Sequence, residues 1–322
     1  MNQKKFAFTM AEILLSLTII GVVAAITLPS LTGNINERTW NTQRKALYAR
    51  MSQAIALMPA LNGYGTLIEG DESTSAVDTA AETFVTAGLS KVLKINNICD
   101  NEHLADCGIV SEYNNIVGSK KTFPKTIREF NSLFDSSHGK IPTDIKAAAF
   151  ETANGESVVA FYNPNCTDNQ LLGGRSGSGE PWYFSQPLMC ANFIYDLNNQ
   201  KGPNTVGKDI GFITVFYPTD SVVVAPVIYN KNVSGDVTQK EAAAVCKTID
   251  QNLRLPNREE LISMFYNRDL INLTSAGANF WSGSVEDSQT GWAVYFYGAN
   301  WGAGSYQQRL RDAELSVRCI YR

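Results

Sequence analysis

The fold is set by the stretch KKFAFTMAE (residues 4–12) and by the apolar run ILLSLTIIGVVAAITLPSL (residues 13–31) that follows it directly. Two lysines precede a segment from Ile13 to Gly33 that carries no charged residue, and one carboxylate, Glu12, lies at its start. About 20 consecutive apolar residues are enough to span a bilayer as a helix. An acid within such a block is costly and is normally kept for a function. The stretch therefore predicts a transmembrane helix with a functional carboxylate near its N-terminal end.

This segment resembles the N-terminus of type IV pilins and of the pseudopilins of type II secretion systems. In that family a small residue precedes the cleavage site, Phe begins the mature chain and Glu follows four residues later, which corresponds here to Ala7, Phe8 and Glu12. Ala7 departs mildly from the family, where Gly is commonest, whereas Gly21 and Pro29 match its helix-loosening positions. The resemblance implies that a prepilin peptidase cuts before Phe8 and that the new amine is methylated. It also implies that Glu12 faces the N-terminal amine of a neighbouring subunit in a filament.

The lysines before the apolar run predict the orientation of the chain in the membrane. Basic residues favour the cytoplasmic side, so everything after Leu31 would cross the inner membrane and become periplasmic or extracellular. The run is longer than the 7–15 apolar residues of an ordinary secretory signal. A plain single-pass anchor, with Glu12 at the level of the lipid headgroups, remains the alternative.

Charge and motif content exclude several function classes. The chain of 322 residues has 27 basic and 31 acidic residues and a formal net charge of −4, without a basic run beyond the leader. It therefore lacks the electrostatic footprint of a nucleic-acid-binding protein. It also lacks the Gly-x-Ser-x-Gly, P-loop and His-Glu-x-x-His motifs and has only two histidines, so we expect a protein that is not an enzyme.

Six cysteines lie outside the apolar segment. In an exported chain an even number of cysteines predicts disulfides. Zinc is the competing interpretation, but there is no Cys-x-x-Cys, and His103 and His138 make a poor ligand set. The sequence does not fix the connectivity. Order and spacing favour the pairs Cys99–Cys107, Cys166–Cys190 and Cys246–Cys319.

The middle of the chain has the pattern of a helix followed by antiparallel strands. Apolar residues recur at helical spacing as far as Met58. Strand-like segments at 147–152 and 157–161 flank Asn154-Gly155, which is a strong hairpin signal. Further strands are expected at 188–197 and 211–217. We therefore predict an α+β fold in which a long N-terminal helix packs on an antiparallel β-meander, as in pilins.

The last 95 residues or so differ from the rest of the chain in composition and in sequence pattern. Thr238 and Asn257 each begin a capping pattern, and the remainder is rich in aromatic residues and glycine. This region resembles a bacterial family with a C-type-lectin-like α+β fold, on the motifs LRLPNREEL (253–261), FWS (280–282), WAV (292–294) and VRC (317–319). In that fold a cysteine of the first helix pairs with one of the last strand, which fits Cys246 and Cys319. The expected parts are a leader at 1–7, a transmembrane and assembly helix at 8–58, a pilin-like domain at 59–227 and a lectin-like domain at 228–322.

Two surfaces are candidates for ligand binding. Oxygen donors recur on a glycine-bearing loop at Asp196, Asn198, Asn204 and Asp209, and calcium takes 6–8 oxygen ligands. Some pseudopilins carry calcium in a corresponding loop. A network of hydrogen-bonded turns is the alternative explanation for the same residues.

The second candidate is the loop region of the lectin-like part. The calcium-binding tripeptides of sugar-binding lectins are missing, so calcium-dependent sugar binding is not expected. Trp301 and Tyr306 are expected on a recognition surface, although Trp301 fits the core equally well, while Trp281 and Trp292 are expected in the core.

The sequence therefore favours a minor type IV pilin-like filament subunit that displays a C-terminal recognition or adhesion domain. Its partners would be other pilin or pseudopilin subunits, the prepilin peptidase, the membrane and a C-terminal ligand of unknown identity. A type II secretion pseudopilin involved in protein export is the first alternative. A membrane-anchored binding protein that never polymerises is the second.

Overall fold

A computed structural model describes residues 10–62, 74–130, 144–163, 171–175, 181–185, 189–216, 223–229, 233, 235–273, 279–285, 287–296 and 306–321. The fold is α+β with an antiparallel sheet, as predicted. The chain divides into two compact units, Met1–Ala46 and Leu47–Arg322. The helices are α1 (Met10–Asn62), α2 (Thr74–Thr83), α3 (Ile127–Phe130), α4 (Gln239–Ile249) and α5 (Arg258–Tyr266), with a π-helical turn at Phe84–Gly88 and 3-10 turns at Leu89–Lys91 and Leu104–Cys107.

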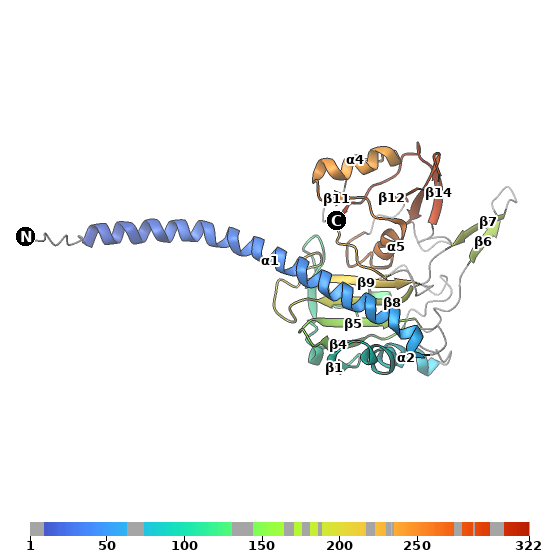
Figure 1. Ribbon diagram of the computed structural model, residues 1–322, viewed down its shortest axis with the longest axis horizontal. Helices are drawn as coiled ribbons and strands as arrows, with labels where there is room; N and C mark the ends of the chain where they lie inside the picture. Colours follow the sequence, from blue (N-terminus) through green and yellow to red (C-terminus); the bar gives the residue numbers. More distant parts are fainter. Residues whose placement is uncertain are drawn as a thin grey trace, which may run out of the picture. The chain divides into compact units, whose positions relative to one another are not determined.

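The main sheet has the strand order β1-β4-β5-β8-β9-β10, and every neighbouring pair is antiparallel (Figure 1). The remaining strands form small sheets, β2-β3, β6-β7, β11-β15 and β12-β13-β14. The strands are β1 (Ile95–Cys99), β2 (Glu112–Asn114), β3 (Lys120–Thr122), β4 (Ala148–Thr152), β5 (Ser157–Tyr162), β6 (Leu171–Arg175), β7 (Pro181–Ser185), β8 (Met189–Asp196), β9 (Ile210–Phe216), β10 (Val223–Val224), β11 (Leu253–Arg254), β12 (Asn279–Val285), β13 (Thr290–Tyr295), β14 (Tyr306–Leu310) and β15 (Ile320–Tyr321).

The predicted hairpin at Asn154-Gly155 is confirmed between β4 and β5. Gly155 has φ +87°, a backbone conformation that glycine adopts without strain. The hairpin register pairs Phe150 with Val158. Local turn chemistry therefore fixes the register between β4 and β5.

The central strands are buried on both faces. All eight residues of β8 and all six of β5 are buried. On one face Phe84 of the π-turn stacks on Tyr162, with ring centroids 4.5 Å apart, and lies 6.0 Å from Phe193. On the other face Phe130 of α3 packs against Phe161 at 4.7 Å. Because both faces are covered, these strands are almost continuously hydrophobic and lack an alternating pattern.

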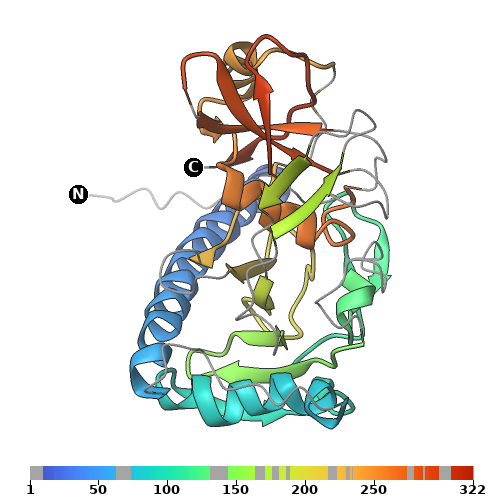
Figure 2. The same ribbon diagram turned by 90° about the vertical axis from the view of Figure 1, so that its right-hand side faces the viewer.

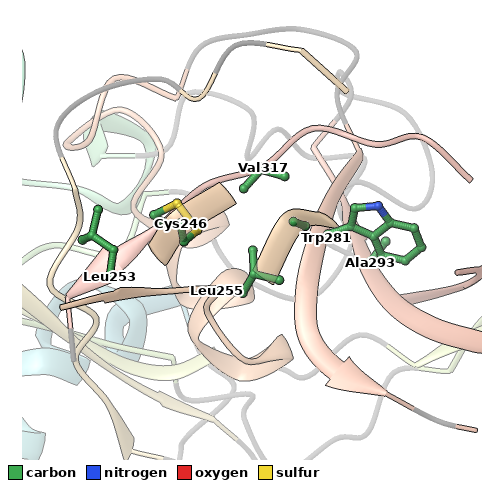
Figure 3. Close-up of a cluster of buried hydrophobic side chains, with 8 residues drawn as sticks. Cys246, Leu253, Leu255, Trp281, Ala293 and Val317 are labelled. Carbon is green, nitrogen blue, oxygen red and sulfur yellow. A yellow bond between two sulfur atoms is a disulfide. The ribbon is translucent and has the colours of Figure 1, made fainter. Parts of the chain in front are cut away.

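The C-terminal module, residues 235–321, has its own core. Both predicted helix starts are confirmed as capping boxes, Thr238 with Glu241 on α4 and Asn257 with Glu260 on α5. Such caps satisfy the free N–H groups of the first turn. A disulfide joins Cys246 on α4 to Cys319 next to β15. Figure 3 shows the buried cluster around it, which consists of Ala242, Cys246, Leu253, Leu255, Trp281, Ala293, Val317 and Cys319.

Candidate functional sites

The first part of α1 is an apolar helix without a packed environment of its own. Between Met10 and Val23 its large apolar side chains are 48–81 % exposed. They point in all directions around the helix, because Ile13, Leu14 and Leu15 are successive and the pattern continues through Val23. Helices that are apolar all round are found buried in a protein core or a membrane. This segment is therefore a candidate surface for burial against something outside the chain.

The described part of the chain contains no helix that is both long enough and apolar enough to cross a membrane.

The predicted processing and assembly residues are only partly described. Ala7 and Phe8 lie outside the described residues. Glu12, Gly21 and Pro29 all lie within helix α1. A Cβ added at Gly21 would meet no atom within 4 Å. Their roles in cleavage and assembly stay predictions.

The second candidate is the loop between β8 and β9, residues 197–209. It brings together the residues that were predicted as oxygen ligands for calcium. The Asn204 N–H donates a hydrogen bond to Asp209 Oδ2 and the Thr205 N–H donates one to Asp209 Oδ1, both at 2.8 Å. At the other end of the loop the Asn198 N–H donates to Asp196 Oδ1 at 3.1 Å. Both carboxylates thus serve as acceptors for the backbone of their own loop.

The electrostatics of this loop are dominated by Asp196. Its side chain is almost fully buried, and Asp209 is fully buried close by. Burial is the main cause that raises the pKa of Asp196 to about 7; the Asn198 N–H opposes this rise and the negative charge of Asp209 adds to it. Asp196 is therefore a carboxyl group that changes protonation near neutral pH.

The loop fits hydrogen-bonded turns better than a calcium cage. The side-chain Nδ2 of Asn198 donates to the Gly202 carbonyl at 3.1 Å. In its best-satisfied orientation the Asn204 amide also points its nitrogen, at 3.3 Å, toward Asp196 Oδ2. Calcium would need oxygens at these positions. Within this loop, which the structure describes in full, Asn198 Oδ1 is the side-chain atom that is buried without a hydrogen-bond partner. Calcium at this loop stays a prediction.

The loop is held in place by the disulfide loop that precedes it in the chain. Gln200 Nε2 donates to the Ala105 carbonyl at 3.4 Å. A Cβ at Gly108 would lie 2.1 Å from Asn199 Oδ1, so only glycine permits this approach. The Cys99–Cys107 disulfide closes the segment that contains Ala105, and Gly108 follows that segment directly. The arrangement can stabilise a loop conformation without any ion.

The disulfide predictions are confirmed for two pairs, Cys99–Cys107 and Cys246–Cys319. The third pair includes Cys166, which lies outside the described residues. Cys190 is fully buried on β8. The Cys166–Cys190 pairing stays a prediction.

The tryptophans of the C-terminal module divide between core and surface. Trp281 is fully buried, and its Nε1 donates to the Val237 carbonyl at 2.8 Å. The prediction that Trp292 is a core residue is wrong: it is half-buried, and the Arg258 guanidinium lies over its ring at 5.2 Å. The neighbours of Trp292 on β13, Gly291 and Ala293, are both buried.

The predicted recognition residues are not tested by this geometry. Trp301 lies outside the described residues, and Tyr306 is described only as the first backbone position of β14. The half-buried Trp292 with Arg258 is the aromatic feature that the structure does describe on this surface. Alternation along the strand could have revealed it, because the two small residues beside Trp292 occupy the inward positions.

Two polar contacts were not predicted from the sequence. Arg50 on α1 pairs with the buried Glu156, and Asn192 on β8 pairs with Asn267 after α5.

No model of a known protein family matches the chain, and no curated protein matches it. No group of three or more His, Cys, Asp or Glu side chains that could hold a metal occurs among the described residues.

Proposed function

We propose that the chain is a non-enzymatic subunit of a type IV pilin-like filament, a minor one, which polymerises through α1 and displays its C-terminal module for recognition or adhesion. The observation that supports this proposal most is the exposed apolar surface of α1 between Met10 and Val23. Removing such a surface from water is favourable. The bilayer provides that environment before assembly, and the helices of neighbouring subunits provide it in the filament.

The carboxylate of Glu12 gives the assembly its register. After cleavage before Phe8, the methylated amine of one subunit would carry a positive charge into the apolar filament core. A buried charge is tolerated only when it is paired, and Glu12 of a neighbouring subunit is the group of opposite sign in the segment. A pair of this kind favours one axial offset between subunits.

The C-terminal module carries the individual task of the subunit. Its fold is closed by a disulfide and its own buried cluster, so its surface loops can vary without loss of the core. An Arg258–Trp292 pair on that surface is of the residue types that are enriched in protein interfaces. The ligand of the module is not specified by these residues.

Replacement of Glu12 tests the proposal. In the cells that produce the protein, the Glu12→Ala variant should reach the membrane in normal amounts but yield no filaments. Glu37→Ala, which removes an exposed acid from the same helix, is the matched control and should assemble normally. Normal filaments from Glu12→Ala would refute the role assigned to Glu12, whereas absence of the unaltered chain from filaments would refute the polymer proposal and leave a membrane-anchored binding protein.

Two further measurements separate the alternatives. The mass of the mature N-terminus should correspond to methylated Phe8, and an uncleaved leader would contradict the processing step. Recovery in filaments sheared from the cell surface supports a pilus, whereas retention in the periplasm points to a secretion pseudopilus.

A further inference from the structure

Four fully buried polar side chains join the main sheet to the C-terminal module. They are Asn192 on β8, Thr214 on β9, Ser263 on α5 and Asn267 just after α5, and we call them the junction cluster. Two come from the sheet and two from the module. Burying a polar side chain costs free energy unless its donors and acceptors form hydrogen bonds within the protein.

The hydrogen bonds of the junction cluster run mainly across the boundary. Asn192 and Asn267 exchange amide hydrogen bonds at 2.8 and 3.0 Å. Thr214 Oγ1 donates to Asn192 Oδ1 at 2.8 Å and lies 2.7 Å from Ser263 Oγ. Asn267 Nδ2 also contacts the Thr214 hydroxyl at 3.2 Å. Separation of the module from the sheet would break this set and leave its amides unpaired.

The helix that carries Ser263 is buried from both sides. The six residues from Leu261 to Tyr266 are all buried. Tyr266 packs toward the sheet, with its ring 5.7 Å from that of Phe216 on β9. Phe265 packs within the module at 5.3 Å from Phe296. Figure 1 and Figure 2 show α5 on the side of the module that faces β8 and β9. The helix therefore belongs to both cores.

The segment that leads from the main sheet into the C-terminal module, residues 223–229, is hydrogen-bonded to both. Residues Val223–Val224 form β10 and pair with β9 at the edge of the main sheet. Three residues later the Tyr321 N–H donates to the Val227 carbonyl, at 2.9 Å, and the Tyr229 N–H donates to the Cys319 carbonyl at 3.1 Å. The connection thus passes from one sheet to the other within a few residues.

We infer that the C-terminal module and the main sheet form one cooperative body, locked by the junction cluster, so that the module is held at a fixed orientation and is not tethered. The observation about folding stands without the filament proposal. If the chain is a filament subunit, the lock has a mechanical consequence that rests on that proposal. A pull on the module would pass through α5 into the sheet and on to α1, without extending a linker.

Hydrogen exchange of the full chain in detergent micelles, followed by mass spectrometry over a series of urea concentrations, tests the inference. Amides of β8–β9 and of β12–β13 should exchange through the same opening, with the same protection and the same urea dependence. Protection that is lost from β12–β13 at lower urea, while β8–β9 stay protected, would overturn it. Neither outcome depends on whether filaments form, so a failure here is distinct from a failure of the proposed function.

Variants of the junction cluster sharpen the test. Asn267→Ala removes the amide pair and leaves Asn192 buried with lost partners, so exchange should accelerate about tenfold or more in both sheets together. Asn252→Ala, at an exposed turn of the module, is the matched control and should leave the exchange rates of both sheets unchanged. Acceleration confined to the module would overturn the inference. Ser263→Ala, a smaller change at the same junction, gives the same readout if Asn267→Ala does not fold.

Discussion

The guanidinium of Arg50 on α1 lies 2.5 Å from the carboxylate of Glu156, which follows the turn between β4 and β5 (Nη2 to Oε1). The Glu156 side chain is only 4 % exposed, whereas that of Arg50 is 29 % exposed. The hydroxyl of Thr152 donates to the second carboxylate oxygen. A buried carboxylate is thus satisfied by one partner from the helix and one from its own hairpin. This contact ties the second half of α1 to the central strands.

Glu156→Ala should lower the free energy of unfolding by about 2 kcal/mol, because it leaves Arg50 and Thr152 without their shared acceptor. Urea unfolding of the full chain in micelles measures this change. Glu112→Ala is the matched control. It breaks an ion pair with Lys120 in which both side chains are more than half exposed, and such pairs contribute about 0–1 kcal/mol. Equal effects of the two variants would contradict the role assigned to Glu156.

Asp196 should make stability depend on pH near neutrality. Its folded-state pKa, about 7, lies above the ordinary value of 3.8, so the folded chain binds a proton that the unfolded chain releases. The stabilisation is fully present below about pH 4 and is lost as the pH rises through about 7. We expect the free energy of unfolding to fall between about pH 4 and about pH 7.

Asp196→Asn keeps the shape of this side chain and removes its titration. The decline in stability over that pH range should therefore become smaller in the variant, as measured by urea unfolding at several pH values. An identical decline in both proteins would show that Asp196 does not cause it. Asp209, which is buried in the same loop, is left unchanged in this comparison.

Calcium is not required to hold the loop of residues 197–209, because the carboxylates already accept backbone N–H groups. We expect the melting temperature at pH 8 to be the same with millimolar calcium and with a chelator. A ligand that binds the folded state stabilises it in proportion to the logarithm of its excess concentration. A melting temperature that rises with calcium would therefore contradict this expectation and establish the ion site.

Features set by neighbouring residues could be predicted from the sequence. The hairpin at Asn154-Gly155 depends on one dipeptide, and the caps at Thr238 and Asn257 depend on residues three positions apart. The Cys99–Cys107 disulfide joins residues separated by only eight positions. In each of these cases the partners lie close together in the chain, so local chemistry is sufficient.

Contacts between residues that are far apart in the chain could not be predicted from sequence patterns. Arg50 and Glu156 are 106 positions apart, and Asn192 and Asn267 are 75 apart. Nothing in an isolated Asn distinguishes a surface residue from a buried one. The loop at Asp196 was found from its composition, but its chemistry depends on whether N–H groups or oxygens face the carboxylates, which only the fold determines.

The two described disulfides should differ in their contribution to stability. Cys246 and Cys319 are 73 positions apart, whereas Cys99 and Cys107 are 8 apart. A longer closed loop removes more entropy from the unfolded chain, so the chain-entropy model gives about 4 kcal/mol for the first and about 2.5 kcal/mol for the second. Unfolding of Cys246→Ser/Cys319→Ser and of Cys99→Ser/Cys107→Ser variants measures the two losses. A larger loss for the short loop would contradict this ranking.

Gly291 is predicted to be indispensable to the packing of the C-terminal module. A Cβ at this position would lie 2.3 Å from Gln239 Nε2 and 2.4 Å from its Oε1. Gln239 is buried and cannot simply move aside, because its Nε2 donates to the Ser282 and Ser284 carbonyls at 3.1 Å. Gly291→Ala should therefore break these hydrogen bonds and cost about 1–3 kcal/mol of unfolding free energy.

Gly283→Ala is the matched control for Gly291, since a Cβ there would meet Leu255 Cβ at 3.4 Å, an ordinary contact distance. It lies on the paired strand β12 and should change stability much less. Urea unfolding followed by tryptophan fluorescence, to which the fully buried Trp281 of the same core contributes, measures the stability of both variants. Equal stability of Gly291→Ala and the wild type would show that Gln239 repacks without loss, and that its bonds to β12 do not hold the core together.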